Sequence, residues 1–163
     1  MSVQPGIFKQ YDIRGVWEKD LTADSAYQIG KAVGSVFMDQ GISEIIVGRD
    51  TRVSGPTIQE LFVKGLNEVG CSTILLGVVS SPMTYASWYL MEAQGSVIIT
   101  ASHNPPEYNG FKIGLRKKHF STQMYQDLYK RIVSADFFTP ERAGTTRDHS
   151  ITEDYIERVT QGI

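Results

Sequence analysis

The sequence predicts an α/β fold of three layers, in which a mostly parallel, mixed sheet of about four strands lies between helices on both faces. Two observations lead to this prediction. Short apolar runs rich in β-branched residues alternate with longer stretches whose apolar residues recur at helical spacing. The chain has 163 residues, which is the size of one domain. The expected strands are residues 44–48, 72–79, 95–101 and 111–115.

The first helix is expected over residues 22–40. Its apolar residues recur at helical spacing, Thr22 or Asp24 can cap its start, and Gly41 ends it. The first strand follows, and it stops at a charged turn over residues 49–52. A helix followed by a buried strand is the beginning of an alternating α/β pattern.

The second and third helices are each expected to begin at a serine followed by a proline in the first turn. Ser54 and Pro56 open the second helix, and Gly70 closes it. Ser81 and Pro82 open the third helix after the second strand. The aromatic residues of the third helix are expected to pack rather than to bind a sugar; they are Tyr85, Trp88 and Tyr89.

The third strand, residues 95–101, ends at Ser102. After a loop, residues 111–115 are expected to return as an antiparallel edge strand. The reason is the dipeptide Asn109-Gly110, which favours a tight turn. The serine therefore lies where a buried strand gives way to a loop.

Ser121 is expected to cap the helix that follows, and residues 1–137 are expected to form the domain. Residues 138–163 are expected to be a linker and the start of a following element. The first half of this segment contains Pro, Gly, Thr and charged residues without a period, and a short helical pattern begins near Thr152. The chain therefore looks like the first part of a longer protein.

Composition excludes several classes of protein. The net charge of −2 gives neither a basic surface for nucleic acid nor a polybasic patch for membranes. Cys71 is the only cysteine, and neither His119 nor His149 has a partner at ligand spacing, so a disulfide or zinc site has no support. No apolar run approaches the roughly 20 residues of a membrane-spanning helix, and the N-terminus lacks a signal-peptide core. We therefore expect a cytoplasmic enzyme or a part of one.

The segment most informative about function is residues 100–113, T-A-S-H-N-P-P-E-Y-N-G-F-K-I. Open α/β sheets bind ligands at the ends of their strands, which is where Ser102 is expected. Lys112 supplies a cation in the same segment. An acyl-transfer hydrolase is disfavoured, because no G-x-S-x-G motif surrounds the serine and the adjacent His103 is poorly placed to act as its base.

Phosphoryl transfer fits these residues better. A phosphoserine carries about −1.5 to −2 charges and three acceptor oxygens, so it needs cations and donors at fixed distances. Arg14 and Lys112 can supply charge, and His103 and Asn104 can donate hydrogen bonds. Positioning and electrostatics then do most of the catalysis. Ser102 is therefore a candidate phosphoryl carrier.

The charged turn before the second helix has two interpretations. It consists of Arg49, Asp50, Arg52 and Ser54. A helix N-terminus with nearby cations can bind an anion. A salt-bridged turn that supports the serine loop is the interpretation we favour.

Three motifs in a fixed order carry a resemblance to a known family. Residues 8–15 read F-K-Q-Y-D-I-R-G, residues 47–55 read V-G-R-D-T-R-V-S-G, and residues 100–112 read T-A-S-H-N-P-P-E-Y-N-G-F-K. Over nearly its whole length the chain resembles the α-D-phosphohexomutases, the phosphomannomutase and phosphoglucomutase enzymes. The resemblance is to the first of the four domains such enzymes usually have, a three-layer α/β/α unit with one antiparallel edge strand.

The resemblance implies an activity and a set of site residues. As a phosphoserine, Ser102 would donate to a hexose monophosphate and take a phosphoryl group back from the bisphosphate intermediate, interconverting mannose or glucose 1- and 6-phosphates. Glucose 1,6-bisphosphate is the implied activator. The other implied residues are Lys112, Arg14 and His103 in catalysis and Tyr11 and Asn104 in substrate binding.

The resemblance also implies Mg²⁺, held between a phosphoryl oxygen on Ser102 and a D-G-D-G-D-type loop of the second domain. No D-x-D occurs in this chain, and the family's G-E-x-S and R-x-S-x-T loops are absent from it. One phosphoserine is not a complete magnesium site. We therefore expect that the chain depends on the remaining domains for turnover. Alone, it should expose an interdomain surface through which it could form a homodimer.

Two alternatives remain open in the sequence. Phosphoglucosamine mutases resemble this chain, but they usually have D-N-G where it has Tyr108-Asn109-Gly110, and T-D-G-I-R-G where it has residues 11–15. Both differences favour a phosphomannomutase or phosphoglucomutase. The second alternative is a binding or scaffold module of this family without catalytic activity.

Overall fold

The sheet is mixed and has seven strands rather than about four, in the computed structural model, which describes residues 3–162. The strands are β1 (Ile13–Val16), β2 (Glu44–Arg49), β3 (Ser72–Val78), β4 (Gly95–Ile99), β5 (Tyr108–Leu115), β6 (Lys118–His119) and β7 (Thr146–Asp148). Across the sheet their order is β1-β5-β4-β2-β3-β7, with β6 beside β5. The four strands β4, β2, β3 and β7, which are neighbours in this order, run parallel to one another. Strand β5 is antiparallel to both of its neighbours, β4 and β1.

Three strands were not expected from the sequence, and they change the position of the antiparallel strand. β1 covers one side of β5, so β5 lies inside the sheet and its prediction as an edge strand was wrong. β7 lies in the segment read as a linker and pairs in parallel with β3. β1, β6 and β7 have four residues or fewer, so pairing with a neighbour, rather than their own propensity, makes them strands.

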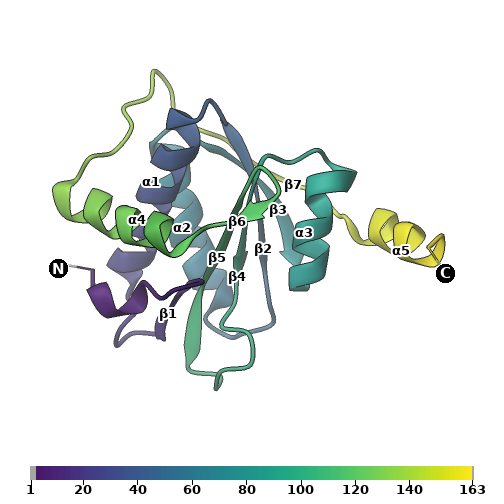
Figure 1. The fold of residues 1–163 in the computed structure, drawn as a ribbon, viewed down its shortest axis with the longest axis horizontal. Coiled ribbons are helices and arrows are strands. Elements are labelled where there is room, and N and C mark those ends of the chain that lie inside the picture. The colour runs from purple at the N-terminus through teal and green to yellow at the C-terminus, as the bar shows by residue number, and fades with distance from the viewer. Residues whose placement is uncertain (1–2, 163) are drawn as a thin grey trace.

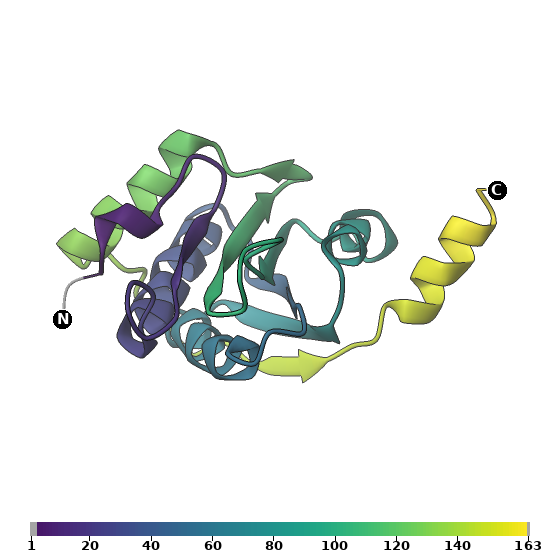
Figure 2. The same cartoon turned by 90° about the horizontal axis from the view of Figure 1, so that it is seen from below.

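Helices cover both faces of the sheet, which confirms the three-layer prediction. A 3₁₀ turn, η1 (Pro5–Ile7), precedes the helices α1 (Ala23–Asp39), α2 (Gly55–Glu68), α3 (Ser81–Leu90), α4 (Thr122–Ser134) and α5 (Thr152–Thr160). Helices α1, α2 and α4 pack on one face, and α3 lies on the other (Figures 1 and 2). The C-terminal α5 projects from the body of the molecule (Figure 2).

Two of the predicted helix caps are confirmed, one lies a residue earlier than predicted, and one has the predicted position without a capping bond. The hydroxyls of Thr22 and Ser121 accept hydrogen bonds from the backbone at the starts of α1 and α4. Helix α3 is capped by Ser80, one residue before the predicted Ser81. Ser54 occupies the predicted N-cap position of α2, but its hydroxyl makes no capping bond and accepts a hydrogen bond from Asn109 Nδ2 at 2.9 Å. This bond links the start of α2 to the strand that follows the serine loop.

The chain does not turn at Asn109-Gly110, so that prediction was wrong. Both residues lie within β5, and Gly110 pairs with Arg14 of β1. A Cβ atom at Gly110 would lie well under 3.0 Å from the carbonyl oxygen of Ile13, so glycine is needed here for close strand packing. The chain reverses earlier, in residues 100–107, which places the loop with Ser102 at the end of the sheet.

The hydrophobic core has one part on each face of the sheet. The larger part joins α1, α2 and α4 to the sheet, and in it the rings of Phe62 and Phe111 lie 4.8 Å apart. On the other face, Trp88 packs beside Tyr85, and its indole N–H donates to Ser96 Oγ at 2.7 Å. The packing role predicted for the α3 aromatics is therefore confirmed for these two rings, whereas Tyr89 is 68% exposed.

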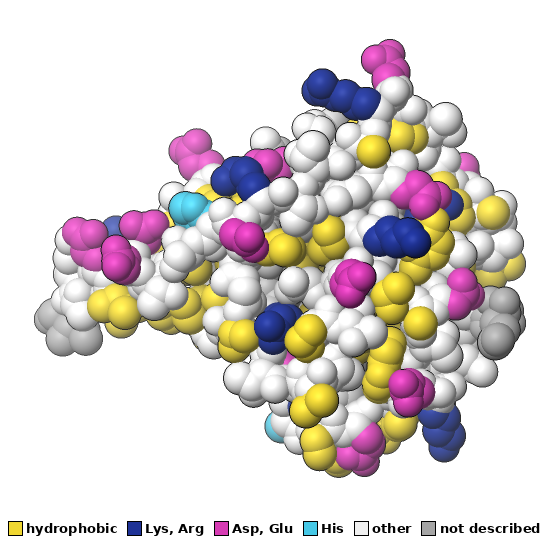
Figure 3. All heavy atoms as spheres, turned by 180° about the vertical axis from the view of Figure 1, so that it is seen from behind, with side chains coloured by type: hydrophobic (Ala, Val, Ile, Leu, Met, Phe, Trp, Pro, Cys, Tyr) yellow, Lys and Arg dark blue, Asp and Glu magenta, His cyan; other side chains and the backbone are white. Residues whose placement is uncertain are grey.

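The C-terminal helix contributes nothing to the core. None of its residues is buried, although Ile151 just before it is fully buried. From behind, acidic side chains lie along one side of the projecting helix and hydrophobic ones along the other (Figure 3). No helix within residues 3–162 is long and apolar enough to span a membrane. The domain boundary at residues 137/138 stays a prediction.

The packing of α1 against α2 depends on two glycines. A Cβ atom at Gly30 would lie well under 3.0 Å from the carbonyl oxygen of Phe62, and one at Gly65 would lie equally close to that of Tyr27. Backbone atoms cannot move aside as a flexible side chain can. The two helices therefore approach so closely that a single methyl group at the crossing would separate them.

We expect Gly30→Ala to lower the free energy of unfolding by about 2 kcal/mol or more, because the overpacking exceeds the gain in helix propensity. Urea unfolding followed by circular dichroism measures this change. Gly6→Ala is the matched control, because a Cβ there meets nothing within 4 Å and should change stability by less than about 0.5 kcal/mol. Equal stability of the two variants would show that the helices do not touch at Gly30.

Candidate functional site

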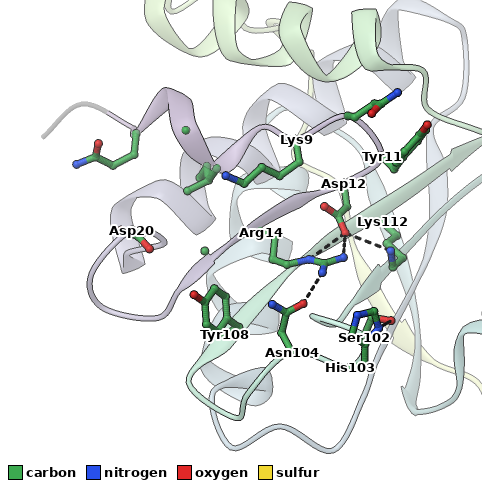
Figure 4. A pocket seen from close by; sticks show the side chains of 15 residues that line it. Lys9, Tyr11, Asp12, Arg14, Asp20, Ser102, His103, Asn104, Tyr108 and Lys112 are labelled. Atoms are coloured by element: carbon green, nitrogen blue, oxygen red, sulfur yellow. Dashed lines mark hydrogen bonds and ion pairs between the residues drawn. The ribbon is translucent and has the colours of Figure 1, made fainter.

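A cavity of about 720 Å³ opens beside the serine loop (Figure 4). The N-terminal segment, β1, the serine loop and β5 line it. Its volume is in the range of cavities that hold small molecules. Ser102 follows the carboxyl end of β4, which is the edge of the sheet where such folds bind ligands.

Ser102 lies on a strained, exposed turn at the cavity. Its φ of +56° is left-handed, a conformation that costs a non-glycine residue roughly 1–2 kcal/mol. Its backbone N–H donates to Thr100 Oγ1 at 2.9 Å, which helps to hold this conformation. The Oγ atom lies 3.4 Å from Nδ1 of His103 and is otherwise open to the cavity. The turn therefore presents the hydroxyl to the cavity.

The carboxylate of Asp12 joins the two predicted cations. It is 4% exposed, and its Oδ2 accepts hydrogen bonds from Arg14 Nε at 3.1 Å and Lys112 Nζ at 3.2 Å, as well as from Arg14 Nη2. Arg14 also donates through Nη1 to Asn104 Oδ1, so the cation contacts the serine loop (Figure 4). The structure thus brings together Arg14, Lys112 and Asn104 around a carboxylate that the sequence analysis did not assign to the site.

The register of β1 against β5 explains this meeting. Ile13 pairs with Phe111, which places Asp12 directly opposite Lys112, 100 residues away in the sequence. Asp12 and Arg14 are two residues apart, so in an extended chain they point to the same side. That alternation was visible in the sequence, but the partner strand was not.

A buried phenol fixes the strand that carries Lys112. The Tyr125 hydroxyl accepts a hydrogen bond from the N–H of Ile113 at 3.2 Å. Burial raises the pKa of Tyr125 above its ordinary value, although the bond from Ile113 opposes this effect. The phenol therefore stays neutral, and it binds the backbone of β5 at the residue next to Lys112, which lines the cavity.

The remaining predicted residues differ in their environment. Tyr11 lines the cavity but is 71% exposed, so it projects from the rim. The charged turn contacts the back of the serine loop, as expected: Asp50 Oδ2 accepts from Thr100 Oγ1 at 2.6 Å. His119 packs against Tyr85 at 4.7 Å and lies outside the cavity lining. Lys9 also lines the cavity and was missed, because a lone lysine carries no local signal.

The fold and the site define an α/β domain that presents an exposed serine to a small cationic cavity at the ends of its strands. The family model described as phosphoglucomutase/phosphomannomutase, alpha/beta/alpha domain I, matches residues 5–139. The chain belongs to this family.

Its relatives agree with that assignment. The chain is 38% identical to a phosphoglucomutase of Neisseria meningitidis over 160 residues, which cover 98% of this chain and 35% of the relative. It is 37% identical to a phosphomannomutase/phosphoglucomutase of Pseudomonas aeruginosa, covering 96% of this chain and 34% of the relative. A crystal structure of a phosphoglucomutase/phosphomannomutase family protein from Burkholderia thailandensis has a TM-score of 0.90 and 36% identity, covering 99% and 36% of the two chains. The chain thus spans about a third of the length of these relatives.

We expect Asp12→Asn to lower the free energy of unfolding by about 2 kcal/mol, because Arg14 and Lys112 would then face each other without a shared anion. Lys112→Met is the comparison: it leaves the pair of Asp12 and Arg14 intact, and should cost less than about 1 kcal/mol. Urea unfolding at low ionic strength measures both. A larger loss for Lys112→Met would show that Asp12 does not organise the two cations.

Proposed function

We propose that this chain is the phosphoserine domain of a phosphohexomutase that interconverts the 1- and 6-phosphates of mannose or glucose. The observation that supports this most directly is the exposed hydroxyl of Ser102, which opens into a cavity lined by Arg14 and Lys112. These cations suit a phosphoryl group with about −1.5 to −2 charges. Phosphoserine and a bound metal are typical of the family.

The proposed reaction begins with a phosphoryl group on Ser102. A hydroxyl oxygen of the hexose monophosphate attacks phosphorus while the bond from phosphorus to Oγ breaks, which yields a hexose bisphosphate. The hydroxyl proton is released to solvent, while Nζ of Lys112, held 3.2 Å from Asp12 Oδ2, binds the attacking oxygen. The bisphosphate then reverses its orientation, and its other phosphoryl group returns to Oγ, so the serine is regenerated with its phosphate.

The other site residues bind and orient in this proposal. Arg14 stabilises charge on the transferring group, and His103, whose Nδ1 is 3.4 Å from Oγ, donates to a phosphoryl oxygen. Asn104 holds Arg14 in place through its side-chain oxygen. Tyr11, at the exposed rim, contacts the sugar.

Magnesium fits this chain only in part. No group of three or more His, Cys, Asp or Glu side chains within residues 3–162 could hold a metal ion. Mg²⁺ needs a near-octahedral set of oxygens, so a phosphoryl oxygen on Ser102 is the one ligand that we assign to this chain. None of the other roles proposed for this chain's residues requires contact with the metal.

The rest of the activity is assigned to chain regions beyond this domain. Because the chain spans about a third of its relatives, we propose that the remaining domains supply the other metal ligands, the sugar contacts and the clamp for the second phosphate. A cytoplasmic location and a homodimer through the interdomain surface stay predictions. The alternatives are a phosphoglucosamine mutase domain and a scaffold module without activity. Phosphoryl uptake at Ser102 and the turnover of different hexose phosphates distinguish them.

We expect glucose 1,6-bisphosphate with Mg²⁺ to place one phosphoryl group on Ser102. Intact and peptide mass spectrometry should find the added phosphate on the peptide that contains residues 100–113. Ser102→Ala is the control and should take up none, whereas Ser121→Ala, which removes an exposed serine outside the cavity, should leave the labelling unchanged. Phosphate on another residue would contradict the assignment of Ser102.

We expect no steady conversion of glucose 1-phosphate or mannose 1-phosphate by this chain alone, because the proposed metal cage and clamp lie outside it. Turnover is measured by coupling the glucose 6-phosphate product to glucose-6-phosphate dehydrogenase, with mannose-6-phosphate isomerase and glucose-6-phosphate isomerase added when mannose 1-phosphate is the substrate. A full-length relative is the positive control. Turnover by the chain alone would contradict the division of the site between domains. Glucosamine phosphates should be tested in the same assay, after the chain is joined to the remaining domains, to separate the mutase alternatives.

A further inference from the structure

The back of the serine loop is bound by one arginine, Arg52, in the turn between β2 and α2. Its Nη1 donates to the carbonyl oxygens of Pro105 at 2.6 Å and Tyr108 at 2.9 Å. Its Nη2 donates to the carbonyl oxygens of Asn104 at 2.8 Å and Ser102 at 3.1 Å. One side chain therefore contacts the loop at four carbonyl groups.

The guanidinium group has no donor left over. Arginine has five N–H donors, and the fifth, on Nε, binds Asp50 Oδ2 at 3.2 Å. Asp50 also accepts a hydrogen bond from the backbone N–H of Arg52 at 3.0 Å, so the carboxylate fixes both ends of the residue. The side chain of Arg52 is 11% exposed, which limits the competition from water for these bonds.

Asp50 links this arrangement to the reactive serine by a second path. Its Oδ2 accepts from Thr100 Oγ1 at 2.6 Å, and Thr100 Oγ1 in turn accepts from the backbone N–H of Ser102 at 2.9 Å. The carbonyl and the N–H of Ser102 are thus both held, one by Arg52 and one through Thr100. These bonds stabilise the left-handed backbone at Ser102, a conformation that an unrestrained serine rarely adopts.

Arg52 does not reach the cavity. It is not among the residues that line it, whereas Ser102, His103 and Asn104 are. Its effect on the reacting group must therefore pass through the loop backbone. This distinguishes it from Arg14, which contacts Asn104 from the cavity side.

We propose that Arg52 is the positioning residue for the phosphoryl-carrying serine: its five-donor fork sets the conformation of residues 102–108 and so the direction of Ser102 Oγ. This inference rests on the proposed function for its catalytic consequence, but not for its structural one. A lysine cannot replace the fork, because it offers three donors from a single nitrogen and cannot span four carbonyl groups.

The test compares Arg52→Ala and Arg52→Lys with the wild-type chain by amide hydrogen exchange and by the ¹³C chemical shifts of Ser102, which report its left-handed backbone. We expect the amides of residues 101–104 and 107–109 to exchange at least roughly tenfold faster in both variants, because each variant loses several charge-assisted hydrogen bonds. The Ser102 shifts should move away from left-handed values, while amides of the central strands keep their rates. Should Arg52→Ala fail to fold, Arg52→Lys, which keeps the stem and the charge, gives the same comparison.

Two controls separate positioning from a general loss of stability. Arg147→Ala removes a surface arginine that pairs with Glu44 at 3.2 Å, far from the loop in the fold, and should leave the loop amides and Ser102 shifts unchanged. Millimolar guanidinium chloride should restore slow exchange in Arg52→Ala, whereas ammonium chloride at the same concentration should not. Unchanged loop exchange in Arg52→Ala, or equal rescue by ammonium, would overturn the proposal.

The chemical consequence is measured separately. With glucose 1,6-bisphosphate and Mg²⁺, we expect phosphoryl uptake at Ser102 to be at least roughly tenfold slower in Arg52→Lys than in the wild-type chain, with partial recovery of Arg52→Ala by guanidinium. If the wild-type chain takes up phosphate and Arg52→Lys does so at the same rate, a role of Arg52 in catalysis is contradicted. If the wild-type chain takes up no phosphate, uptake requires the remaining domains, and the exchange and shift measurements still decide whether Arg52 positions the loop.

Discussion

The carboxylate of Asp12 is the interaction on which the site depends most. Two cations, Arg14 and Lys112, share it within 3.2 Å, and without it they would repel each other in a partly buried place. The shared anion lets both cations face one cavity. Because one carboxylate cannot neutralise two cations, positive charge remains there for an anionic ligand.

The serine loop lies between two acid–arginine pairs that have different tasks. On the cavity side, Asp12 orients Arg14 toward the loop and the ligand space. On the opposite side, Asp50 orients Arg52 toward the loop backbone. The first pair places positive charge at the cavity, and the second fixes the conformation of the loop backbone. The loop is therefore held from both sides while the hydroxyl of Ser102 stays exposed.

This division explains how an exposed loop can be held in one conformation. Loops at strand ends are usually mobile, because their backbone groups bond to water. Here four carbonyl groups of the loop bond to one largely buried guanidinium group, and the N–H of Ser102 bonds to Thr100. The strain at Ser102 is therefore balanced locally, while its hydroxyl stays open to the cavity.

Residue types and their spacing were enough to predict the local features: the helix capped by Thr22, the buried strand that ends near Ser102, and the turn around Arg52 that supports the serine loop. These depend on neighbours in the chain, so residue type and spacing reveal them. The tertiary structure alone decided the position of β5, where Asn109-Gly110 extends a strand instead of making a turn. Pairing with β1 outweighs the local turn preference, and its register places Asp12 opposite Lys112 across 100 residues of sequence, a match that no local pattern encodes.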